Sequence, residues 1–238
     1  MAAASRLALP LATSTDSLLI FRFHRRGNMR HRSFISSSFA VIAALASFWP
    51  VVAAAQIKEE RSWCSDRQGI SAEIRIQSCT AVIERGGDSS KQQAINFKSR
   101  GIAYFQKQDY DRAVQDFNQA IKLNSRYSTA FHQRCWTLAA INRLDDALKD
   151  CTEALRLRPQ FVPTLNSLGI VYLRLGRFDD AIATYNAGLQ IDPKSAYALY
   201  GRGTAKLRKG DRAGGEADLA ASKSIKDVAA EMTGYGVK

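Results

Sequence analysis

Side chains that could do chemistry are few after residue 55. They are four cysteines and one histidine: Cys64, Cys79, Cys135, Cys151 and His132. A cysteine thiolate beside an imidazole serves many enzymes as a nucleophile, and cysteines and histidines at fixed spacings bind zinc. His132 and Cys135 are one helical turn apart, so a thiol dyad is the catalytic arrangement to weigh first.

Neither catalysis nor metal binding is what the sequence favours. Cys135 falls at a small, buried position of the repeat described below, which disfavours a free thiolate. The cysteines and His132 lack the paired spacing of zinc ligands. Gly201 and Gly203 lie within an expected helix and not in a phosphate-binding loop, and no pair of acids is expected to converge. We therefore predict that the chain is not an enzyme and has no cofactor and no metal.

The elements that position these residues repeat every 34 residues between Phe97 and Pro193. Four sets of residues share this step: Gly101, Cys135, Gly169 and Gly203; Ala113, Ala147, Ala181 and Gly215; Phe117, Cys151, Tyr185 and Leu219; and Phe97, Phe131, Leu165 and Leu199. Pro159 and Pro193 end successive repeats, with Ser125 at the same place one repeat earlier. A fixed period of this length indicates stacked helical hairpins.

Each repeat has the pattern of two helices of roughly 12 to 15 residues, with apolar residues three and four positions apart. Small residues such as Gly169 let the two helices approach closely, while Phe117 or Tyr185 fills the space between hairpins. Acidic residues at the start of the second helix favour the positive end of its dipole, and they are Asp111, Asp145, Asp146, Asp179 and Asp180. Pro159 and Pro193 then end that helix.

This spacing of small, aromatic and proline positions resembles the tetratricopeptide repeat (TPR) over roughly residues 94–227. The resemblance implies an all-α, TPR-type helical-hairpin solenoid of four repeats, 94–127, 128–161, 162–195 and 196–229. The fourth repeat departs from the pattern, because Lys206 replaces a tyrosine, Gly215 an alanine and Asp227 a proline. Terminal repeats are expected to differ because one of their faces meets water.

The segments on either side of the repeats are expected to be short. Residues 56–93 form a pre-repeat segment, in which 56–70 is polar and expected to be irregular. Residues 71–85 have the pattern of an amphipathic helix that caps the first hairpin. At the other end, a closing helix over 227–232 is expected to precede a frayed tail at 234–236, within the terminal segment 230–238.

An even number of cysteines in an exported chain indicates disulfides. In TPR packing the small position of the first helix faces the aromatic position of the second, which implies a Cys135–Cys151 bridge within one hairpin. Cys64 would then join the segment around Trp63 to Cys79 on the capping helix. The alternative is that Cys135 and Cys151 are small buried apolar residues.

Residues 1–55 have the pattern of a leader. An apolar run from Ser38 to Val52 follows basic residues and ends at three alanines, which predicts a signal peptide cleaved after Ala55. The run is too short for a comfortable membrane span of about 20 residues, so no stable span is expected after cleavage. Residues 1–28 exceed a normal leader, and either Met29 is the true start or they form an organelle-targeting segment. We predict a periplasmic or secreted bacterial protein.

The net charge of the chain is +12, of which residues 1–55, with six arginines and one aspartate, supply +5. The remaining +7 is spread over the helices without a lysine or arginine run interleaved with aromatics, so no nucleic-acid partner is expected.

The chain also resembles a group of cysteine-containing exported TPR proteins that is common in alphaproteobacteria. The resemblance rests on the Trp63-Cys64 segment, the Arg134-Cys135-Trp136 segment and the Tyr235-Gly236-Val237 tail.

In TPR arrays the first helix of each hairpin lines a concave groove that takes peptide segments. The positions implied for this chain are Lys98, Ile102 and Phe105; His132, Trp136 and Ala139; Asn166, Ile170 and Leu173; and Tyr197, Tyr200, Thr204 and Leu207. The large aromatics Trp136, Tyr197 and Tyr200 are expected on exposed surface, where they could anchor a peptide. Alternatively, they pack on the next repeat or lie in solvent without a binding role.

Chaperone-binding TPR domains share a clamp of lysine, asparagine and arginine for a terminal carboxylate. Lys98 matches one clamp position, but the asparagine expected four residues later is Ile102, and the other partners are Gln133, Pro163 and Ser167. We therefore expect no carboxylate capture.

The prediction for function is a non-catalytic protein–protein interaction module, an envelope adaptor or scaffold that binds a protein or peptide partner in the groove. Two alternatives stay open. One is a structural protein that self-associates into a homo-oligomer. The other is a binder of small molecules or cell-wall fragments that uses the aromatics Trp136 and Tyr200.

Overall fold

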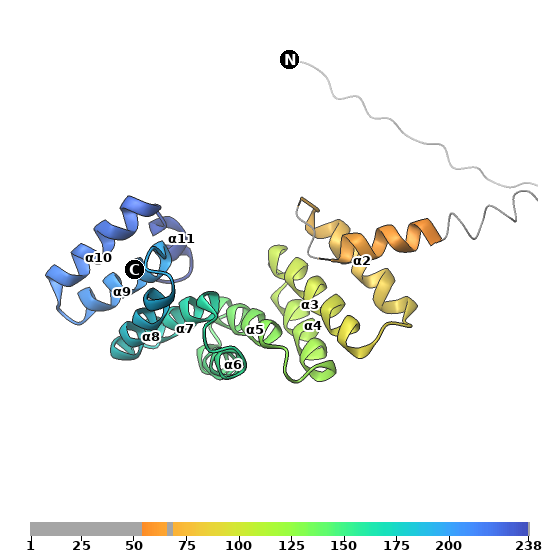
Figure 1. Ribbon diagram of the computed structural model, residues 1–238, viewed down its shortest axis with the longest axis horizontal. Coiled ribbons are helices and arrows are strands. Elements are labelled where there is room, and N and C mark those ends of the chain that lie inside the picture. Colours follow the sequence, from red (N-terminus) through yellow and green to blue (C-terminus); the bar gives the residue numbers. More distant parts are fainter. Residues whose placement is uncertain (1–53, 66–68, 238) are drawn as a thin grey trace, which may run out of the picture. The chain divides into compact units, whose positions relative to one another are not determined.

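The computed structural model describes residues 54–65 and 69–237, which are helices joined by short turns (Figure 1). The predicted signal peptide and its alternative starts therefore lie outside the described residues, apart from the last two positions of the leader. Residues 54–64 form a first helix, which α2 (Ala72–Arg85) follows. No helix of the described ranges is long and apolar enough to cross a bilayer.

Four helical hairpins follow α2, at the places the 34-residue period predicts. Their helices are α3 (Ser90–Gln106) with α4 (Tyr110–Leu123), α5 (Ser128–Ala140) with α6 (Leu144–Leu157), α7 (Val162–Arg174) with α8 (Phe178–Ile191), and α9 (Ala196–Arg208) with α10 (Arg212–Ile225). A short helix, α11 (Ala229–Gly234), closes the described chain. Consecutive helices from α2 to α10 pack on one another, the first helices of successive hairpins, α3, α5, α7 and α9, also meet, and α11 packs on α9. The predicted all-α TPR-type solenoid is confirmed.

The turn inside each hairpin contains one residue with positive φ, and this position also recurs every 34 residues. The four are Gln108, Asn142, Gly176 and Gly210, with φ between 60° and 87°. A left-handed residue after a helix is a common way to end it. Asp109 and Asp211 then cap the following helix with their side chains, as Ser71, Ser89 and Ser195 do elsewhere.

Small residues allow the close helix packing that the sequence predicts. A Cβ added at Gly101 would lie 2.7 Å from the Phe117 ring, and one at Gly169 would lie 2.4 Å from the Tyr185 ring. Both rings are fully buried. In the first and third hairpins the core is therefore a glycine on the first helix against a ring 16 residues later on the second, whereas the second hairpin has the Cys135–Cys151 disulfide at these positions and the fourth has Gly203 with Leu219.

The pre-repeat segment differs from the expectation. Residues 56–70 were expected to be irregular, but 54–64 are helical. Cys64 and Cys79 are joined as a disulfide, and Glu60 forms an ion pair with Arg85 at the end of α2. This helix has few apolar residues and so lacks the periodic pattern that predicts a helix. Its contacts with α2 come from the disulfide and the ion pair, whereas other helices pack through an apolar face.

The C-terminal tail also differs from the expectation. Residues 234–236 were expected to fray, yet Val237 is only 2% exposed, and Met232 and Val228 are buried in the core cluster around Tyr185. The Val237 amide donates to the Met232 carbonyl at 3.0 Å and closes the end of α11. The tail is therefore packed on the repeats.

Candidate functional site

A hollow runs across the first helices of the second, third and fourth hairpins. Its walls include His132 and Trp136 on α5, Asn166 and Ile170 on α7, and Tyr197 on α9, and its volume is about 530 Å³. This volume is within the range of small-ligand or side-chain pockets. Five predicted groove positions from three repeats therefore meet at one surface, which we call the aromatic groove.

The C-terminal tail enters this groove. The Tyr235 ring contacts the Trp136 ring edge to face, with centroids 4.5 Å apart and planes 74° apart. Beyond this pair a second hollow is lined by Phe105 and Arg174, together with residues 233–236 of the tail. Residues almost 100 positions apart thus form one site.

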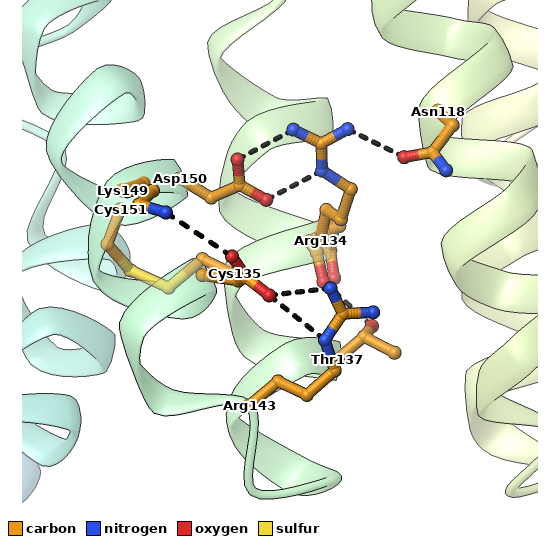
Figure 2. Close-up of polar contacts among 10 residues, drawn as sticks. Asn118, Arg134, Cys135, Thr137, Arg143, Lys149, Asp150 and Cys151 are labelled. Atoms are coloured by element: carbon orange, nitrogen blue, oxygen red, sulfur yellow. Dashed lines mark hydrogen bonds and ion pairs between the residues drawn. A yellow bond between two sulfur atoms is a disulfide. The ribbon is translucent and has the colours of Figure 1, made fainter.

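The two residues before Trp136, Arg134 and Cys135, join α5 to α6 (Figure 2). Cys135 is bonded to Cys151 on α6, with Cα atoms 5.4 Å apart, and both are fully buried. Arg134 donates from Nε and Nη2 to the two carboxylate oxygens of Asp150, each at 2.6 Å. A covalent bond and a bidentate ion pair therefore fix α5 to α6 immediately beside the groove tryptophan.

This ion pair belongs to a second 34-residue pattern, which the sequence prediction missed. Arginines on the first helix pair with aspartates 16 residues later on the second: Arg100 with Asp116, Arg134 with Asp150, and Arg202 with Asp218. In the third repeat Leu168 and Thr184 stand at these positions. The signal that could have revealed the pairs is the shared separation of 16, the same as that of Cys135 and Cys151.

The partners of these arginines extend beyond their own hairpins. Arg134 also donates from Nη1 to Asn118 of the preceding hairpin, and Arg202 donates in the same way to Asn186. Burial alone would raise the pKa of Asp218, but contacts with Arg202 and Lys206 outweigh it and hold the pKa below its usual value. Arg134 and Arg202 therefore join neighbouring repeats through their hydrogen bonds to asparagine, and the two helices of one repeat through their ion pairs.

His132 lies in the groove wall as a neutral side chain. Burial lowers its pKa from 6.5 to about 4, its Nε2 lies 3.2 Å from Ser167 Oγ, and its ring meets Phe161 edge to face. Since Cys135 is bonded to Cys151, it offers His132 no thiol in this structure. The groove wall at His132 is therefore uncharged at neutral pH.

The other predicted groove residues are not all at the aromatic groove. Phe105 lines the second hollow, while Leu173 and Thr204 line a third one with Val237. Lys98, Ile102 and Tyr200 do not line these three hollows, and Lys98 is only 7% exposed.

The prediction of exposed aromatics is wrong for this structure. Trp136, Tyr197 and Tyr200 are each partly buried and pack against the core cluster that contains Tyr185 and Leu199. The alternative, packing on a neighbouring repeat, describes them better. The tail contributes to this burial, because Tyr235 contacts Trp136 and Glu231 accepts a hydrogen bond from Tyr197.

Several groove residues were not among the predicted groove positions, although Gln133, Pro163 and Ser167 had been considered as clamp positions. They are Gln133, Val162, Pro163, Ser167, Asp192, Ser195, Arg174 and Tyr235. Pro163 and Ser167 follow the spacing of Asn166 and Ile170 along α7 and could have been found from the helical period. Tyr235 could not, because nothing in its spacing relates it to the repeat.

Family comparisons agree with this geometry. Residues 96–127 match the model described as tetratricopeptide repeat, and residues 171–210 match the one described as TPR repeat. The comparison with curated proteins gave no match.

Solved structures share the fold. MamA 41-end from Desulfovibrio magneticus RS-1 is 19% identical, with a TM-score of 0.63 over 74% of this chain and 96% of that one. YrrB, described as a TPR protein with an unusual peptide-binding site, is 21% identical, with a TM-score of 0.56 over 68% of this chain and 81% of that one. At these identities the likeness concerns the fold. Together with the two family matches, it shows that the chain is a tetratricopeptide repeat protein.

Proposed function

We propose that this chain is a protein-interaction module of the bacterial envelope that holds a segment of a partner protein in the aromatic groove. The observation that carries the proposal is the convergence of Trp136, Ile170 and Tyr197 from three successive repeats on one hollow. Aromatic side chains in a partly desolvated pocket are the usual anchors of a protein interface. YrrB supports a peptide as occupant, since it is a TPR protein of the same fold that is described as having a peptide-binding site.

The test is cross-linked capture from the envelope fraction. Wild type is compared with a Trp136→Ala/Tyr197→Ala variant and with Lys149→Ala, which changes a side chain on α6 that is 78% exposed. We expect a partner that wild type and Lys149→Ala capture and that the groove variant loses. A partner set shared by all three proteins would place binding on another surface.

The two rival functions predict other outcomes. A self-assembling scaffold would show a mass in light scattering that rises with concentration. It would also capture further copies of itself, to the same extent in wild type and in the groove variant. A binder of cell-wall fragments would retain soluble muropeptides in a Trp136-dependent manner and capture no protein.

We also propose that the chain is exported and oxidised, with cleavage after Ala55 and bridges at Cys64–Cys79 and Cys135–Cys151. Both pairs are bonded and buried in the structure, which suits an oxidising compartment. Intact mass of the envelope protein should give a chain that begins at Gln56 and takes up no thiol reagent in denaturant. A full-length chain, or one with reactive thiols, would contradict export or oxidation respectively.

A further inference from the structure

Residues 235–237 of the same chain, which we call the tail segment, lie along the aromatic groove and the two hollows beside it. Tyr235 lies against Trp136 and reaches both the first and the second hollow. Val237 follows into the third hollow beside Leu173. An aromatic residue, a glycine and an aliphatic residue therefore lie in consecutive positions along the groove.

Gly236 allows this path. Its φ is +80°, and a Cβ at this position would lie 3.2 Å from Arg174 Nε. Both the backbone conformation and the space beside Arg174 therefore favour glycine. Arg174 itself is fixed, since it donates to the Ala139 carbonyl and to Asn142 Oδ1 of the preceding hairpin. The tail segment thus packs against a side chain, Arg174, whose position is set by contacts outside the tail.

The tail segment is joined to the repeats through a short helix, and Val228, Met232 and Val237 are its contacts with the core cluster around Tyr185. Helix α11 has six residues, and among the helices it packs on α9. Its polar contacts, from Tyr197 and Lys226 to Glu231, are at exposed positions. Such a short terminal element can leave the repeats without unfolding them, because opening energies are smallest at chain ends.

We propose that the tail segment is a resident occupant of the aromatic groove, and that the groove recognises partner segments of the same chemistry: an aromatic side chain, then glycine, then an aliphatic residue. The proposal rests on the proposed function and specifies its partner class. A partner segment would place its ring on Trp136 and its aliphatic side chain beside Leu173, and it must displace the tail segment to do so. The neutral His132 and the apolar Ile170 in the wall disfavour a charged residue at the ring position.

The tail in cis lowers the apparent affinity for any such segment. A tethered occupant acts at an effective concentration of about millimolar, and the apparent dissociation constant equals the intrinsic one divided by the fraction of molecules whose groove is open. Releasing the tail segment should therefore tighten binding without any change in the groove wall.

The test uses the full chain and a fluorescent peptide with the sequence of residues 233–238. Its affinity is measured by anisotropy for wild type and for an unlatched variant, Tyr235→Ala/Val237→Ala. Tyr235→Phe is the matched control, since it keeps the ring. The unlatched variant that also carries Trp136→Ala tests whether the peptide binds in the aromatic groove.

We expect the unlatched variant to bind the peptide about tenfold more tightly than wild type and Tyr235→Phe, a gain of about 1.4 kcal/mol. Trp136→Ala should abolish this gain. Equal affinity of wild type and unlatched variant, or a gain that survives Trp136→Ala, would overturn the proposal. So would a wild-type dimer that the unlatched variant loses, because the tail would then bind a second copy.

A pair of glycine variants keeps the test independent of side-chain truncation in the core. Gly236→Ala should release the tail segment and tighten peptide binding, whereas Gly234→Ala should not, because nothing lies within 4 Å of a Cβ at Gly234. Equal peptide affinity of the two variants would also overturn the proposal.

Failure of this inference is distinguishable from failure of the proposed function. If envelope capture requires Trp136 but the unlatched variant gains nothing, the groove binds a partner and the tail segment is merely structural. If the peptide binds the unlatched variant through Trp136 but capture of envelope partners does not depend on Trp136, the tail segment is a groove occupant as proposed and the adaptor function is wrong.

Discussion

At the scale of single residues, glycines decide how closely the helices of a repeat approach. Gly169 faces the buried Tyr185 ring, where a Cβ would lie 2.4 Å from the ring carbon Cζ, while a Cβ at Gly188 would meet nothing closer than 3.8 Å. Gly169→Ala should lower the free energy of unfolding by about 1–3 kcal/mol through overpacking. Gly188→Ala should raise it by about 0.5–1 kcal/mol, because alanine loses less entropy in a helix.

Urea unfolding of the two variants measures both effects. Two changes of the same sign would show that Gly169 does not mark the contact between α7 and α8. A larger Gly169→Leu substitution should cost at least as much as Gly169→Ala, since the side chain has no free space to enter.

His132 makes stability depend on pH. Its pKa is 6.5 in the unfolded chain and about 4 in the folded protein, because burial disfavours the imidazolium. Between these values the unfolded chain binds more protons, so stability falls as pH falls from 6.5 towards 4 and is unaffected by His132 above 6.5. The loss should reach about 1–2 kcal/mol, allowing for the partial exposure of the ring.

The control is His132→Gln, which removes the titrating group. Urea unfolding at pH 7.5 and at pH 4.5 should show that wild type loses about 1–2 kcal/mol more than the variant over this range. An equal loss in the two proteins would mean that His132 is accessible to protons in the folded state.

At the scale of elements, the Arg–Asp pairs fix the two helices of a hairpin. Asp150 is 6% exposed and accepts two hydrogen bonds from Arg134 on the facing helix. Asp150→Ala leaves the guanidinium without its carboxylate and should destabilise by about 1–3 kcal/mol. Glu153→Ala breaks an exposed pair with Arg156 within α6 and should cost under about 0.5 kcal/mol. Thermal melts compare the two, and equal costs would contradict the structural role of the inter-helix pair.

The disulfide Cys135–Cys151 fixes the same pair of helices beside Trp136. In the chain-entropy model, removing a bridge of this loop length with Cys135→Ala/Cys151→Ala should destabilise by about 3 kcal/mol. The midpoint of urea unfolding should fall accordingly in the absence of reductant. In the presence of reductant, wild type should lose most of its advantage over the variant, and a difference that reductant leaves unchanged would argue that the two cysteines stabilise by packing alone.

At the scale of the whole molecule, the four hairpins could be predicted because one period sets both their helices and their packing. The same period places Trp136, Ile170 and Tyr197 on the first helices, and the structure brings them together. The Arg–Asp pairs could have been predicted in the same way, since an arginine is followed by an aspartate 16 residues later in three of the four repeats.

The ends of the array could not be predicted in this way. The helix at 54–64 is held by Cys64–Cys79 and by Glu60 with Arg85, contacts that leave no helical period in the sequence. The tail contacts Trp136 from 99 positions away, and a run such as Gly234-Tyr235-Gly236 has the composition of a loop. Long-range contacts of a non-repeating segment carry no periodic signal, and so the aromatics of the groove were expected to be exposed.

The most direct measurement of partner binding in the aromatic groove is the indole NMR signal of Trp136, with that of Trp63 as internal reference. The partner captured from the envelope is added to ¹⁵N-labelled protein, and Trp136→Phe assigns the signal. We predict that the Trp136 indole resonance shifts or broadens as the partner replaces Tyr235, while that of Trp63 stays in place. An unmoved Trp136 resonance in the saturated complex would contradict the groove as the binding site.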